Sequence, residues 1–462
     1  MWPLLACFAG LLVLDRAGFG PAPGARGPGV SFLLVLLLAF GALWWGLRRL
    51  GAATGSRSDV PVAGILAVAV VLRLLALPLT SSLSDDVYRY LWDGRVAASG
   101  ANPYLLTPDD ESLAGLRDDL WRKTAHRDLA TVYPPLALGM FAGAAVLPWP
   151  LLAYKLALAA VDLAGCALLL LLARRRGSAW MALAYVWNPL LVIEGAGMGH
   201  VDVLGASLVI GCVWLLVGGS RWGRRRTRFV AAGVVAALAA LAKLVPLVTL
   251  PLWWRHGGSR QSRRFAVGAV SLLPPATVAV LLWTRGVPPG LVEYALRWEY
   301  NGPVYEPLWR LIGALRLDLA ASGVVHLARV IFGGDVEATP WSTLYSYAYP
   351  QFLARIVLLA AGVVLWLRLW RRRPEPVRAA FGAFAVVLLM SPTFYPWYLI
   401  WILPWAALTG ARAVLALSAT LPLAYLPVVT GMPYFPWVYG AVWLPPLILL
   451  LLARRHPEPS SP

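Results

Sequence analysis

The stretch that decides the fold class is the apolar run VPVAGILAVAVVLRLLALPL (residues 60–79), which is soon followed by the polar run SDDVYRYLWDGR (residues 84–95). An apolar run of about 20 residues can cross the ~30 Å hydrocarbon core of a bilayer as one helix. Comparable runs recur along the whole chain, whereas a secretory signal would be one short run followed by soluble sequence. The sequence therefore predicts an all-α polytopic membrane protein.

The composition excludes the soluble classes of protein. Of the 462 residues, 60% are apolar and 13% are charged, whereas soluble domains average about 25% charged residues. Each of the three cysteines, Cys7, Cys166 and Cys212, lies inside an apolar run. A framework of disulfides and a zinc site made of cysteines are therefore excluded.

We expect a bundle of about 11–13 transmembrane helices, with short interfacial helices in the outer loops. The expected spans are residues 2–14, 30–47, 60–79, 153–173, 179–194, 200–218, 265–284, 350–370, 379–391, 397–410, 413–429 and 435–452. Two further segments do not fit a simple crossing, because 133–148 is too short and 229–253 has arginines at both ends. We expect 229–253 to break near Lys243 into two half-helices. Residues 1–455 are predicted to form one membrane-embedded domain, and 456–462 a disordered tail.

Basic residues are grouped in seven loops that we place in the cytoplasm, because the cytoplasmic loops of membrane proteins are rich in Lys and Arg. The groups are Arg48, Arg49 and Arg57; Arg174–Arg176; Arg221–Arg228; Arg255–Arg264; Arg368–Arg378; Arg412; and Arg454 with Arg455. They hold 23 of the 40 basic residues and account for the net charge of +18, so we expect no nucleic acid as a partner. The loops 15–29, 81–132 and 285–349 together carry more acids than bases and are predicted to lie outside.

The first large outer loop begins with a predicted short helix that carries two adjacent acids. Ser84 suits the N-cap, Asp85 and Asp86 fall in the first turn, and Gly100 suits the end of the helix. Adjacent carboxylates raise each other's pKa, so one of them could act as a general base near neutral pH. The alternative is that both acids only cap the helix and contact water.

Glu194, His200 and Asp202 lie near the outer ends of two predicted spans. Insertion scales put the cost of a charged group at the centre of a helix at about 2.5–3.5 kcal/mol, and the cost is lower near the interface. The three residues indicate either a functional site, to which Tyr133 at the end of the outer loop would contribute, or a hydrogen-bonded tie between the helices. One histidine with two carboxylates at irregular spacing is a weak metal signature, so we expect neither a metal ion nor another cofactor.

Lys243 is the strongest candidate for binding an anion such as a phosphate, because it occupies a broken apolar segment. The alternative is that its side chain snorkels to the nearer interface. Arg297 lies in a second outer loop that is rich in aromatic residues, and Trp397 and Tyr398 lie in a third. Aromatic faces beside polar groups suit a sugar, although the same composition describes an aromatic belt.

These motifs resemble those of the C-type (GT-C) membrane glycosyltransferases. The chain is most similar to the bacterial polyprenyl-phosphate-mannose-dependent alpha-mannosyltransferases and the neighbouring glycosyltransferase family 87, and the resemblance covers roughly residues 60–410. It depends on the order of the motifs and on their shared side of the membrane. The matching stretches are Asp85–Arg95, Asn102–Tyr104, Tyr133–Pro135, Asn188–Pro189 with Glu194, Gly199–Asp202, Leu241–Lys243, and Pro396–Tyr398 near Leu403–Pro404.

The resemblance implies a GT-C-like bundle in which Asp85 is the catalytic base and Asp86 is the alternative. It implies an inverting enzyme that transfers a hexose, with mannose expected, from a polyprenyl-phosphate sugar to a hydroxyl of an outward-facing glycan or lipid. The groups available to stabilise the leaving phosphate are Lys243, His200, Arg89 and Arg297. We expect the protein in the inner membrane of the cell envelope, with its site facing the periplasm.

The rival interpretation is a transporter or flippase of a lipid-linked sugar, because broken helices and buried charges also mark transport sites. Transporters commonly have two similar halves, and the sequence contains no second copy of the pattern in residues 85–104. The sequence therefore favours the enzyme.

Overall fold

The computed structural model describes residues 1–19, 28–54, 61–177, 179–218, 225–333, 335–337 and 340–455. Within these ranges the chain folds into α-helices joined by turns, loops and short 3-10 or π-helical pieces. The β-type pairing found there is limited to isolated bridges from Tyr300 and Asn301 to Thr393. The predicted all-α class is therefore confirmed. The predicted tail 456–462 lies outside the described residues, as do Arg57 and the part of a basic loop at 219–224.

Seven of the described helices are long and apolar enough to cross a membrane, or eight if the bent pair Tyr305–Ala314 and Leu317–Phe332 is one span. The seven are Trp2–Phe19, Gly29–Arg49, Pro150–Arg175, Ser259–Thr284, Pro350–Arg372, Arg412–Thr430 and Tyr434–Ala453. Six shorter apolar helices are Val62–Ala76, Pro135–Ala145, Asp202–Val217, Thr227–Ala242, Val245–Trp254 and Pro376–Met390. The polytopic class is confirmed. The expected total of about 11–13 crossings stays a prediction, because it requires several of the shorter helices to span the bilayer.

Contacts divide the chain into two compact units. The first comprises Met1–Arg297, Pro374–Phe381 and Pro396–Pro462, and the second comprises Trp298–Arg373 and Gly382–Tyr395. Each unit has its own packing and is described by itself. A single domain over residues 1–455 stays a prediction.

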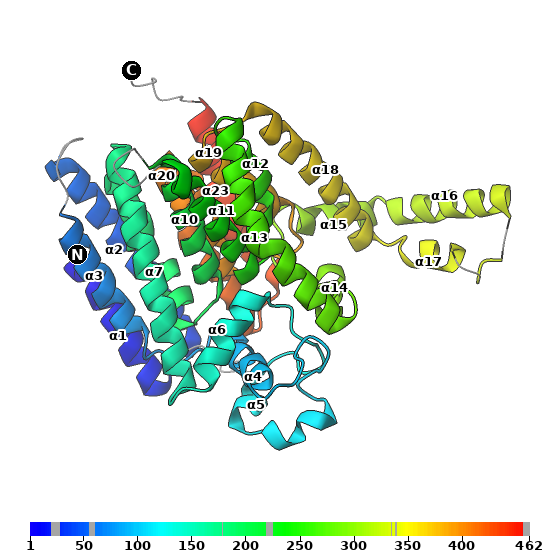
Figure 1. The fold of residues 1–462 in the computed structure, drawn as a ribbon, viewed down its shortest axis with the longest axis horizontal. Helices are drawn as coiled ribbons and strands as arrows, with labels where there is room; N and C mark the ends of the chain where they lie inside the picture. The colour runs from blue at the N-terminus through cyan, green and yellow to red at the C-terminus, as the bar shows by residue number, and fades with distance from the viewer. Residues whose placement is uncertain are drawn as a thin grey trace. The chain divides into compact units, whose positions relative to one another are not determined.

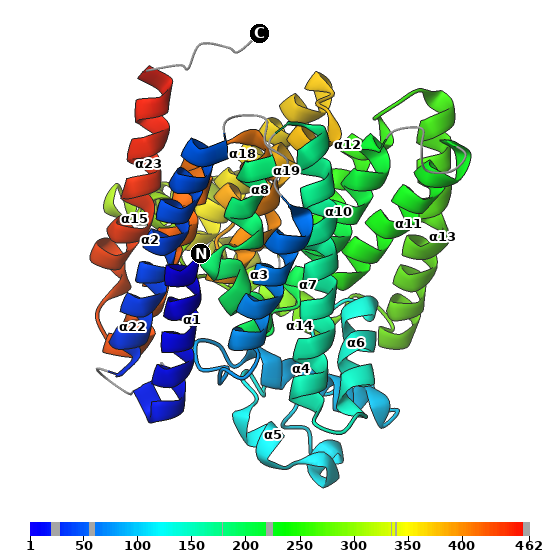
Figure 2. The same ribbon diagram turned by 90° about the vertical axis from the view of Figure 1, so that its left-hand side faces the viewer.

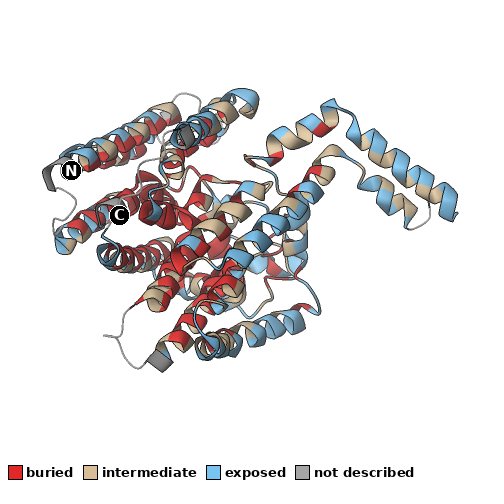
Figure 3. Ribbon diagram, turned by 90° about the horizontal axis from the view of Figure 1, so that it is seen from above, coloured by how far each residue is buried: buried red, intermediate tan, exposed pale blue. Residues whose placement is uncertain are grey.

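The first unit contains two groups of helices that pack side by side (Figures 1 and 2). The first group is α1 (Trp2–Leu14), α2 (Pro28–Thr54), α3 (Val62–Ala76) and α7 (Pro150–Arg175). The second group, joined to the first through α7, is α10 (Asp202–Val217), α11 (Arg225–Ala242) and α13 (Ser259–Thr284). The C-terminal helices are α21 (Arg412–Thr420), α22 (Leu426–Thr430) and α23 (Tyr439–Arg455), whereas α19 (Pro376–Met390) contributes to both units. Figure 3 shows that buried residues gather in the inner helices of this unit.

A buried ion pair ties α3 to α7 inside the first unit. Arg73 Nε lies 2.8 Å from Asp162 Oδ2, and both side chains are almost fully buried. Arg73 also donates a hydrogen bond to the carbonyl of Val186 at 2.7 Å. The two charges offset each other, which is the usual condition for an ionisable group at such a depth.

Two apolar runs are broken near polar residues. The predicted break in 229–253 is confirmed, because α11 ends at Ala242 and a 3-10 turn (Val245–Thr249) leads into α12 (Leu250–Trp254). The run 179–194 breaks at Asn188. Its three pieces are α8 (Ala179–Val186), α9 (Pro189–Val192) and the π-helical turn η4 (Ile193–Gly197).

The segment 397–410, predicted to be a span, does not form one continuous α-helix. The run folds as a 3-10 helix, η6 (Pro396–Trp401), followed by α20 (Leu403–Thr409), and nearly all of its side chains are buried. Pro404 favours the interruption, because proline has no N–H to donate within a helix but is tolerated in the first turn. Irregular backbone of this kind is tolerated at membrane depth where protein surrounds it.

Loops that the charge pattern places on the same side of a membrane contact one another. On the predicted outer side, Asn102 Nδ2 donates to the carbonyl of Trp283 at 3.1 Å. On the predicted cytoplasmic side, Arg176 forms two hydrogen bonds to Glu375, with N–O distances of 2.8 and 2.7 Å. The grouping of these loops into two sides is therefore consistent with the packing of the first unit.

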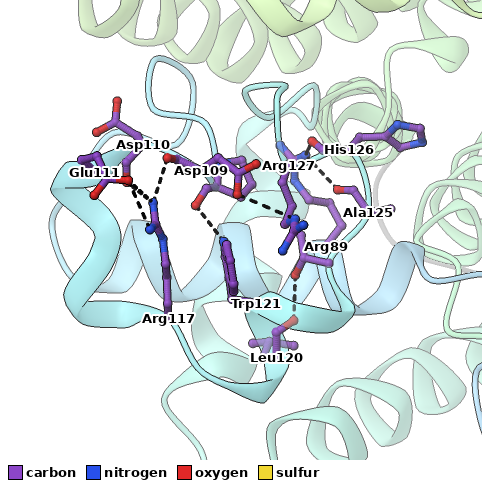
Figure 4. A network of polar contacts seen from close by, with 12 residues as sticks. Arg89, Asp109, Asp110, Glu111, Arg117, Leu120, Trp121, Ala125, His126 and Arg127 are labelled. Carbon is purple, nitrogen blue, oxygen red and sulfur yellow. Dashed lines mark hydrogen bonds and ion pairs between the residues drawn. The ribbon is translucent and has the colours of Figure 1, made fainter.

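The loop 81–132, which is predicted to lie outside, is internally ordered (Figure 4). Its helical segments are α4 (Asp86–Ala98), η3 (Glu111–Leu116) and α5 (Asp119–Lys123), and α6 (Pro135–Ala145) follows it. Arg117 donates to the carbonyls of Asp109 and Asp110 at 2.8 and 3.0 Å, and Trp121 Nε1 donates to the carbonyl of Pro108 at 3.0 Å. The guanidinium of Arg127 lies 4.3 Å from the centre of the Trp121 ring, in the range of a cation–π interaction.

The helix that follows the paired acids begins one residue later than predicted. Its N-cap is Asp85, and Ser84 Oγ accepts a hydrogen bond from the N–H of Asp86 at 3.3 Å. The predicted end is confirmed, because Ser99 is the C-cap and Gly100 follows it with a φ of +86°. Asp86 therefore occupies the first turn of α4, whereas Asp85 stands at its edge.

The second unit has a small core of its own. α15 (Tyr305–Ala314) packs on α18 (Pro350–Arg372), and the buried residues between them are Tyr305, Ile312, Ala354 and Leu358. α16 (Leu317–Phe332) follows α15 at a bend of 69° and leads to α17 (Trp341–Ser346). In the described part of the chain, no side chain of α16 is buried. Helices within 285–349 are thus confirmed, whereas the outer position of this segment stays a prediction.

We expect Gly94→Ala to disturb the packing of α4 on α6. A Cβ atom at Gly94 would come within 2.3 Å of the carbonyl carbon of Phe141, and backbone cannot move aside as a flexible side chain can. The free energy of unfolding should fall by about 1–3 kcal/mol, measured by thermal unfolding of the detergent-purified protein. Gly139→Ala on α6 is the matched control, because a Cβ atom there meets nothing within 4 Å. An unchanged midpoint for Gly94→Ala would contradict this close approach.

Candidate active site

An imidazole between two carboxylates forms the centre of the candidate site. His200 is fully buried, and its Nε2 lies 3.2 Å from Glu194 Oε2 while its Nδ1 lies 3.7 Å from Asp86 Oδ2. Neither contact has the geometry of a hydrogen bond, so both are close approaches of the imidazole to a carboxylate. Glu194 is held from its other oxygen by the hydroxyl of Tyr425, which donates at 2.9 Å. Three predicted site residues thus meet in the first unit.

Local backbone geometry brings the histidine to the acids. The side chain of Asn188 caps α9 by accepting a hydrogen bond at 3.0 Å from the N–H two residues later. Gly199 has a φ of +82°, a region that glycine adopts without a steric penalty. A Cβ atom at Gly199 would also lie 3.0 Å from Val87 Cγ2. The glycine therefore lets His200 approach the first turn of α4, where Asp86 lies.

An ion pair between a buried aspartate and a partly buried lysine forms the second part of the candidate site. Lys243 follows the end of α11, and its Nζ lies 2.8 and 2.7 Å from the two carboxylate oxygens of Asp202. Asp202 is the first residue of α10, where the helix dipole favours a negative charge. Its Oδ1 also accepts a hydrogen bond from Trp401 Nε1 at 2.6 Å. The ammonium of Lys243 is therefore offset by a carboxylate inside the protein, and the snorkelling alternative is not what the structure shows.

Aromatic rings of η6 contact His200 and Lys243. Trp397 stacks on His200, with ring centroids 3.8 Å apart. Lys243 Nζ lies 4.7 Å from the centre of the Tyr398 ring, in the range of a cation–π interaction. The hydroxyl of Tyr398 also contacts that of Tyr294. Trp397 and Tyr398 therefore contact His200 and Lys243 directly, which a belt facing only the membrane interface would not do.

Tyrosines connect the paired acids with the predicted residue Tyr133. The hydroxyl of Tyr90, one turn after Asp86 on α4, donates to Asp86 Oδ2 at 3.3 Å. The ring of Tyr133 meets that of Tyr90 edge to face, with centroids 4.9 Å apart. Tyr154 also packs on Tyr90, and its buried hydroxyl has no hydrogen-bond partner among the described residues.

Asp85 and Asp86 lie in different surroundings. Asp86 is half-buried beside His200, whereas Asp85 is exposed at the N-cap of α4. Partial loss of hydration against the surrounding protein raises the pKa of Asp85, and the negative charge of Asp86 raises it further. Asp85 is therefore reachable from water and more basic than an ordinary aspartate.

Two of the predicted ligands, Arg89 and Arg297, are engaged elsewhere. Arg89 is buried, and its Nε donates to Asp93 at 2.8 Å while its two other nitrogens donate to carbonyls of the outer loop at 2.7 Å each. Its guanidinium thus ties α4 to the loop. Arg297, at the end of α14 (Pro289–Arg297), is exposed and pairs with Glu293 at 2.6 Å.

Four aromatic residues of the site are not indicated by sequence reasoning; they are Tyr90, Tyr294, Trp401 and Tyr425. Helical spacing could have found two of them, because Tyr90 and Trp401 each lie four residues after a predicted site residue. Tyr425 lies in an apolar run and contacts Glu194 from more than 200 residues away in the sequence, since that hydrogen bond joins positions 231 apart. No local pattern indicates such a contact.

The arrangement combines proton acceptors with one ammonium group. The carboxylates of Asp86, Glu194 and Asp202 surround His200 and Lys243, and Asp85 adds an exposed carboxylate at the edge. Such a site can take a proton from a hydroxyl and can offer an ammonium to an incoming anion. Within the described ranges, no group of three or more His, Cys, Asp or Glu side chains is placed to hold a metal ion.

Comparisons with known proteins place the chain among sugar-transferring enzymes. The profile of the family described as "Alpha-(1->6)-mannopyranosyltransferase, N-terminal domain" matches residues 13–255. Alpha-(1->6)-mannopyranosyltransferase A of Mycobacterium tuberculosis is 28% identical, over 84% of this chain and 72% of that protein. A probable alpha-(1->6)-mannopyranosyltransferase of Mycolicibacterium smegmatis is 25% identical, over 92% of this chain and 80% of that protein.

Among solved structures, the crystal structure of ArnT from Cupriavidus metallidurans bound to undecaprenyl phosphate is similar, with a TM-score of 0.44. The two proteins are 16% identical, and the match covers 85% of this chain and 72% of the other. This weaker likeness carries no conclusion about the site.

We expect Lys243→Met to lower the melting temperature, because it leaves Asp202 buried without a cation. Removing one partner of a buried ion pair typically costs about 3–5 kcal/mol. The double variant Lys243→Met/Asp202→Asn removes both charges and should recover most of the loss. Thermal unfolding of the purified variants measures both effects. A double variant as unstable as Lys243→Met would argue against a stabilising ion pair.

Proposed function

Because the chain belongs to the alpha-(1->6)-mannopyranosyltransferase family, we propose that it is an inverting mannosyltransferase of the cell envelope. The proposed donor is a polyprenyl-phosphate mannose, and the proposed acceptor is a hydroxyl of a glycan or lipid. The observation that carries the proposal is that residues 13–255, which match the family, contain every carboxylate of the candidate site together with its histidine and its lysine. Relatives named as mannopyranosyltransferases support mannose as the sugar.

In the proposed reaction, Asp85 acts as the general base. It takes the proton of the acceptor hydroxyl while the oxygen forms a bond to C1 of mannose, and the bond from C1 to the phosphate oxygen breaks on the opposite face of the sugar. One displacement inverts the anomeric centre. The raised pKa and exposure of Asp85 support this role. Asp86 is the alternative base, since it lies beside His200.

The leaving polyprenyl phosphate gains negative charge, which a cation must stabilise. Lys243 is the proposed cation, and the phosphate would compete with Asp202 for its ammonium group. His200 is the second candidate, because its protonated ring would add a positive charge beside Glu194. Arg89 is a weaker candidate than either, because its guanidinium already binds Asp93 and loop carbonyls.

The proposed location is the inner membrane, with the site open to the periplasm. The apolar helices offer the prenyl chain lipid-like surroundings. The proposal includes no nucleotide, because the donor lipid itself carries the activated sugar. It also includes no metal ion, and activity after dialysis against a chelator tests that part.

We expect Asp85→Asn to lower the turnover number by roughly 10²–10⁴-fold, because general-base catalysis contributes about that factor. The assay supplies purified protein in liposomes with radiolabelled polyprenyl-phosphate mannose and a mannoside acceptor, and it measures the new glycosidic bond. Asp109→Asn, which alters an acid elsewhere in the same loop, is the matched control. Full activity of Asp85→Asn together with loss in Asp86→Asn would transfer the role to Asp86.

The same liposomes distinguish the enzyme from a flippase. Movement of labelled lipid to the opposite leaflet without a new glycosidic bond would refute the transferase and support the rival. Product analysis of the wild-type protein also gives the anomeric configuration, and a retained configuration would refute the single displacement.

We expect kcat/KM to rise with pH through the raised pKa of Asp85, because only the ionised carboxylate can accept the proton. The loss of activity on acidification should therefore begin at a higher pH than for an ordinary aspartate. In Asp86→Asn, the residual activity should show its acid limb at a lower pH, because one cause of the raised pKa is removed. An unshifted limb in that variant would contradict the electrostatic link between the two acids.

A further inference from the structure

Residues 78–80 join α3 to the segment that begins α4, and charged side chains from elsewhere bind their backbone. The carbonyl of Leu79 accepts a hydrogen bond from Lys155 Nζ at 2.9 Å. The N–H of Thr80 donates to Asp15 Oδ2 at 3.0 Å, and its hydroxyl donates to the other oxygen of the same carboxylate. Two neighbouring residues of one loop are therefore held from two sides.

The two charged side chains come from different helices. Lys155 lies on α7, and Asp15 directly follows α1. Arg16, the next residue, adds a hydrogen bond of 2.9 Å to the carbonyl of Pro78. Three consecutive residues of the loop, 78 to 80, are thus fixed by hydrogen bonds from side chains distant in sequence.

The side chains of Asp15 and Lys155, which bind residues 79 and 80, are both buried. Lys155 and Asp15 are only 2% and 7% exposed, and burying an ionisable group costs free energy unless it is offset. Asp15 is the charge that acts on Lys155, so each offsets the other in part. Arg73 and Asp162, in contrast, bind each other directly across two helices. The contacts of Asp15 and Lys155 are directed at the backbone of one loop.

The loop of residues 78–80 leads to the proposed base, Asp85, and it also packs on η4, the turn before His200. Asp85 follows Thr80 after a short turn, and it caps the helix that carries Asp86. A Cβ atom at Gly197 would lie 3.4 Å from a methyl group of Leu79, so the loop packs on η4 as well. A shift of the loop would therefore displace both the start of α4 and the turn that leads to His200.

We propose that Asp15 and Lys155 are positioning residues of the transfer reaction, because they fix the loop that places Asp85 and Asp86. The inference rests on the proposed function. Neither side chain contacts the reacting atoms. Their loss misplaces the base relative to a donor that still binds, so kcat falls and KM for the donor stays nearly unchanged.

The first test compares two substitutions of the lysine. Lys155→Met keeps the length of the side chain and removes its N–H donors, and kcat is expected to fall roughly ten- to a hundredfold. Lys155→Arg keeps the charge and the donors and is expected to restore most of the turnover. Both variants are assayed in liposomes, with kcat expressed per folded protein from size-exclusion chromatography. A wild-type kcat for folded Lys155→Met overturns the inference.

The second test addresses the carboxylate and does not depend on the first. Asp15→Leu removes both acceptor oxygens and is expected to lower kcat, whereas Asp15→Asn keeps one acceptor for the Thr80 N–H and is expected to lose less. Thr80→Val removes only the hydroxyl contact and gives the smallest loss. If Lys155→Met does not fold, this series decides the question, and equal kcat values along it overturn the inference.

The matched control is Asp162→Asn, which removes a buried carboxylate from the helix that carries Lys155. It is expected to lower the melting temperature and to leave the kcat of the folded protein unchanged, because Asp162 does not contact the loop. A loss of kcat equal to that of Lys155→Met would show a general effect of destabilisation and overturn the inference. A wild-type protein that transfers no mannose refutes the proposed function, and the inference with it.

Discussion

The candidate site depends on the ion pair between the buried Asp202 and the partly buried Lys243. It joins the first residue of α10 to the break that follows α11, so it ties two helix ends together. Removing the lysine would leave the carboxylate of Asp202 buried without a cation. Trp401 donates a hydrogen bond to the same carboxylate, so the ion pair also anchors η6, whose rings contact His200 and Lys243. His200, two residues before Asp202, is held where it faces Glu194 and Asp86.

The first unit uses buried charge in three distinct ways. Arg73 and Asp162 bind each other and tie two helices together. Asp15 and Lys155 bind the backbone of a loop. The cluster around His200 brings three carboxylates together with one lysine and one imidazole. A reactive group on a loop needs support from rigid elements, and the first two arrangements supply it for the third.

The sequence predicts features that depend on neighbouring residues, but it does not predict contacts between residues that are far apart in the chain. Apolar runs indicate a membrane protein, and arginines at both ends of 229–253 indicate the break beside Lys243. Both patterns can be recognised within a short stretch of sequence. Hydropathy cannot separate lipid-facing from protein-facing apolar runs, so it does not indicate that the side chains of 397–410 are buried in protein. Arg89 is misjudged because spacing shows a guanidinium on a helix but not the loop carbonyls that bind it. The contact of Tyr425 with Glu194 has no local signal at all.

α16 has a practical consequence for handling the protein. No side chain of α16 is buried within the described chain, although the helix contacts α15, α17 and α18, and several of its Leu, Val and Ile side chains are exposed. Because an isolated helix of this length is marginal in water, we expect an amphiphile that covers this apolar side to support its helicity. The choice of detergent or lipid nanodisc becomes a determinant of secondary structure in the second unit, and circular dichroism recorded in different amphiphiles would report it.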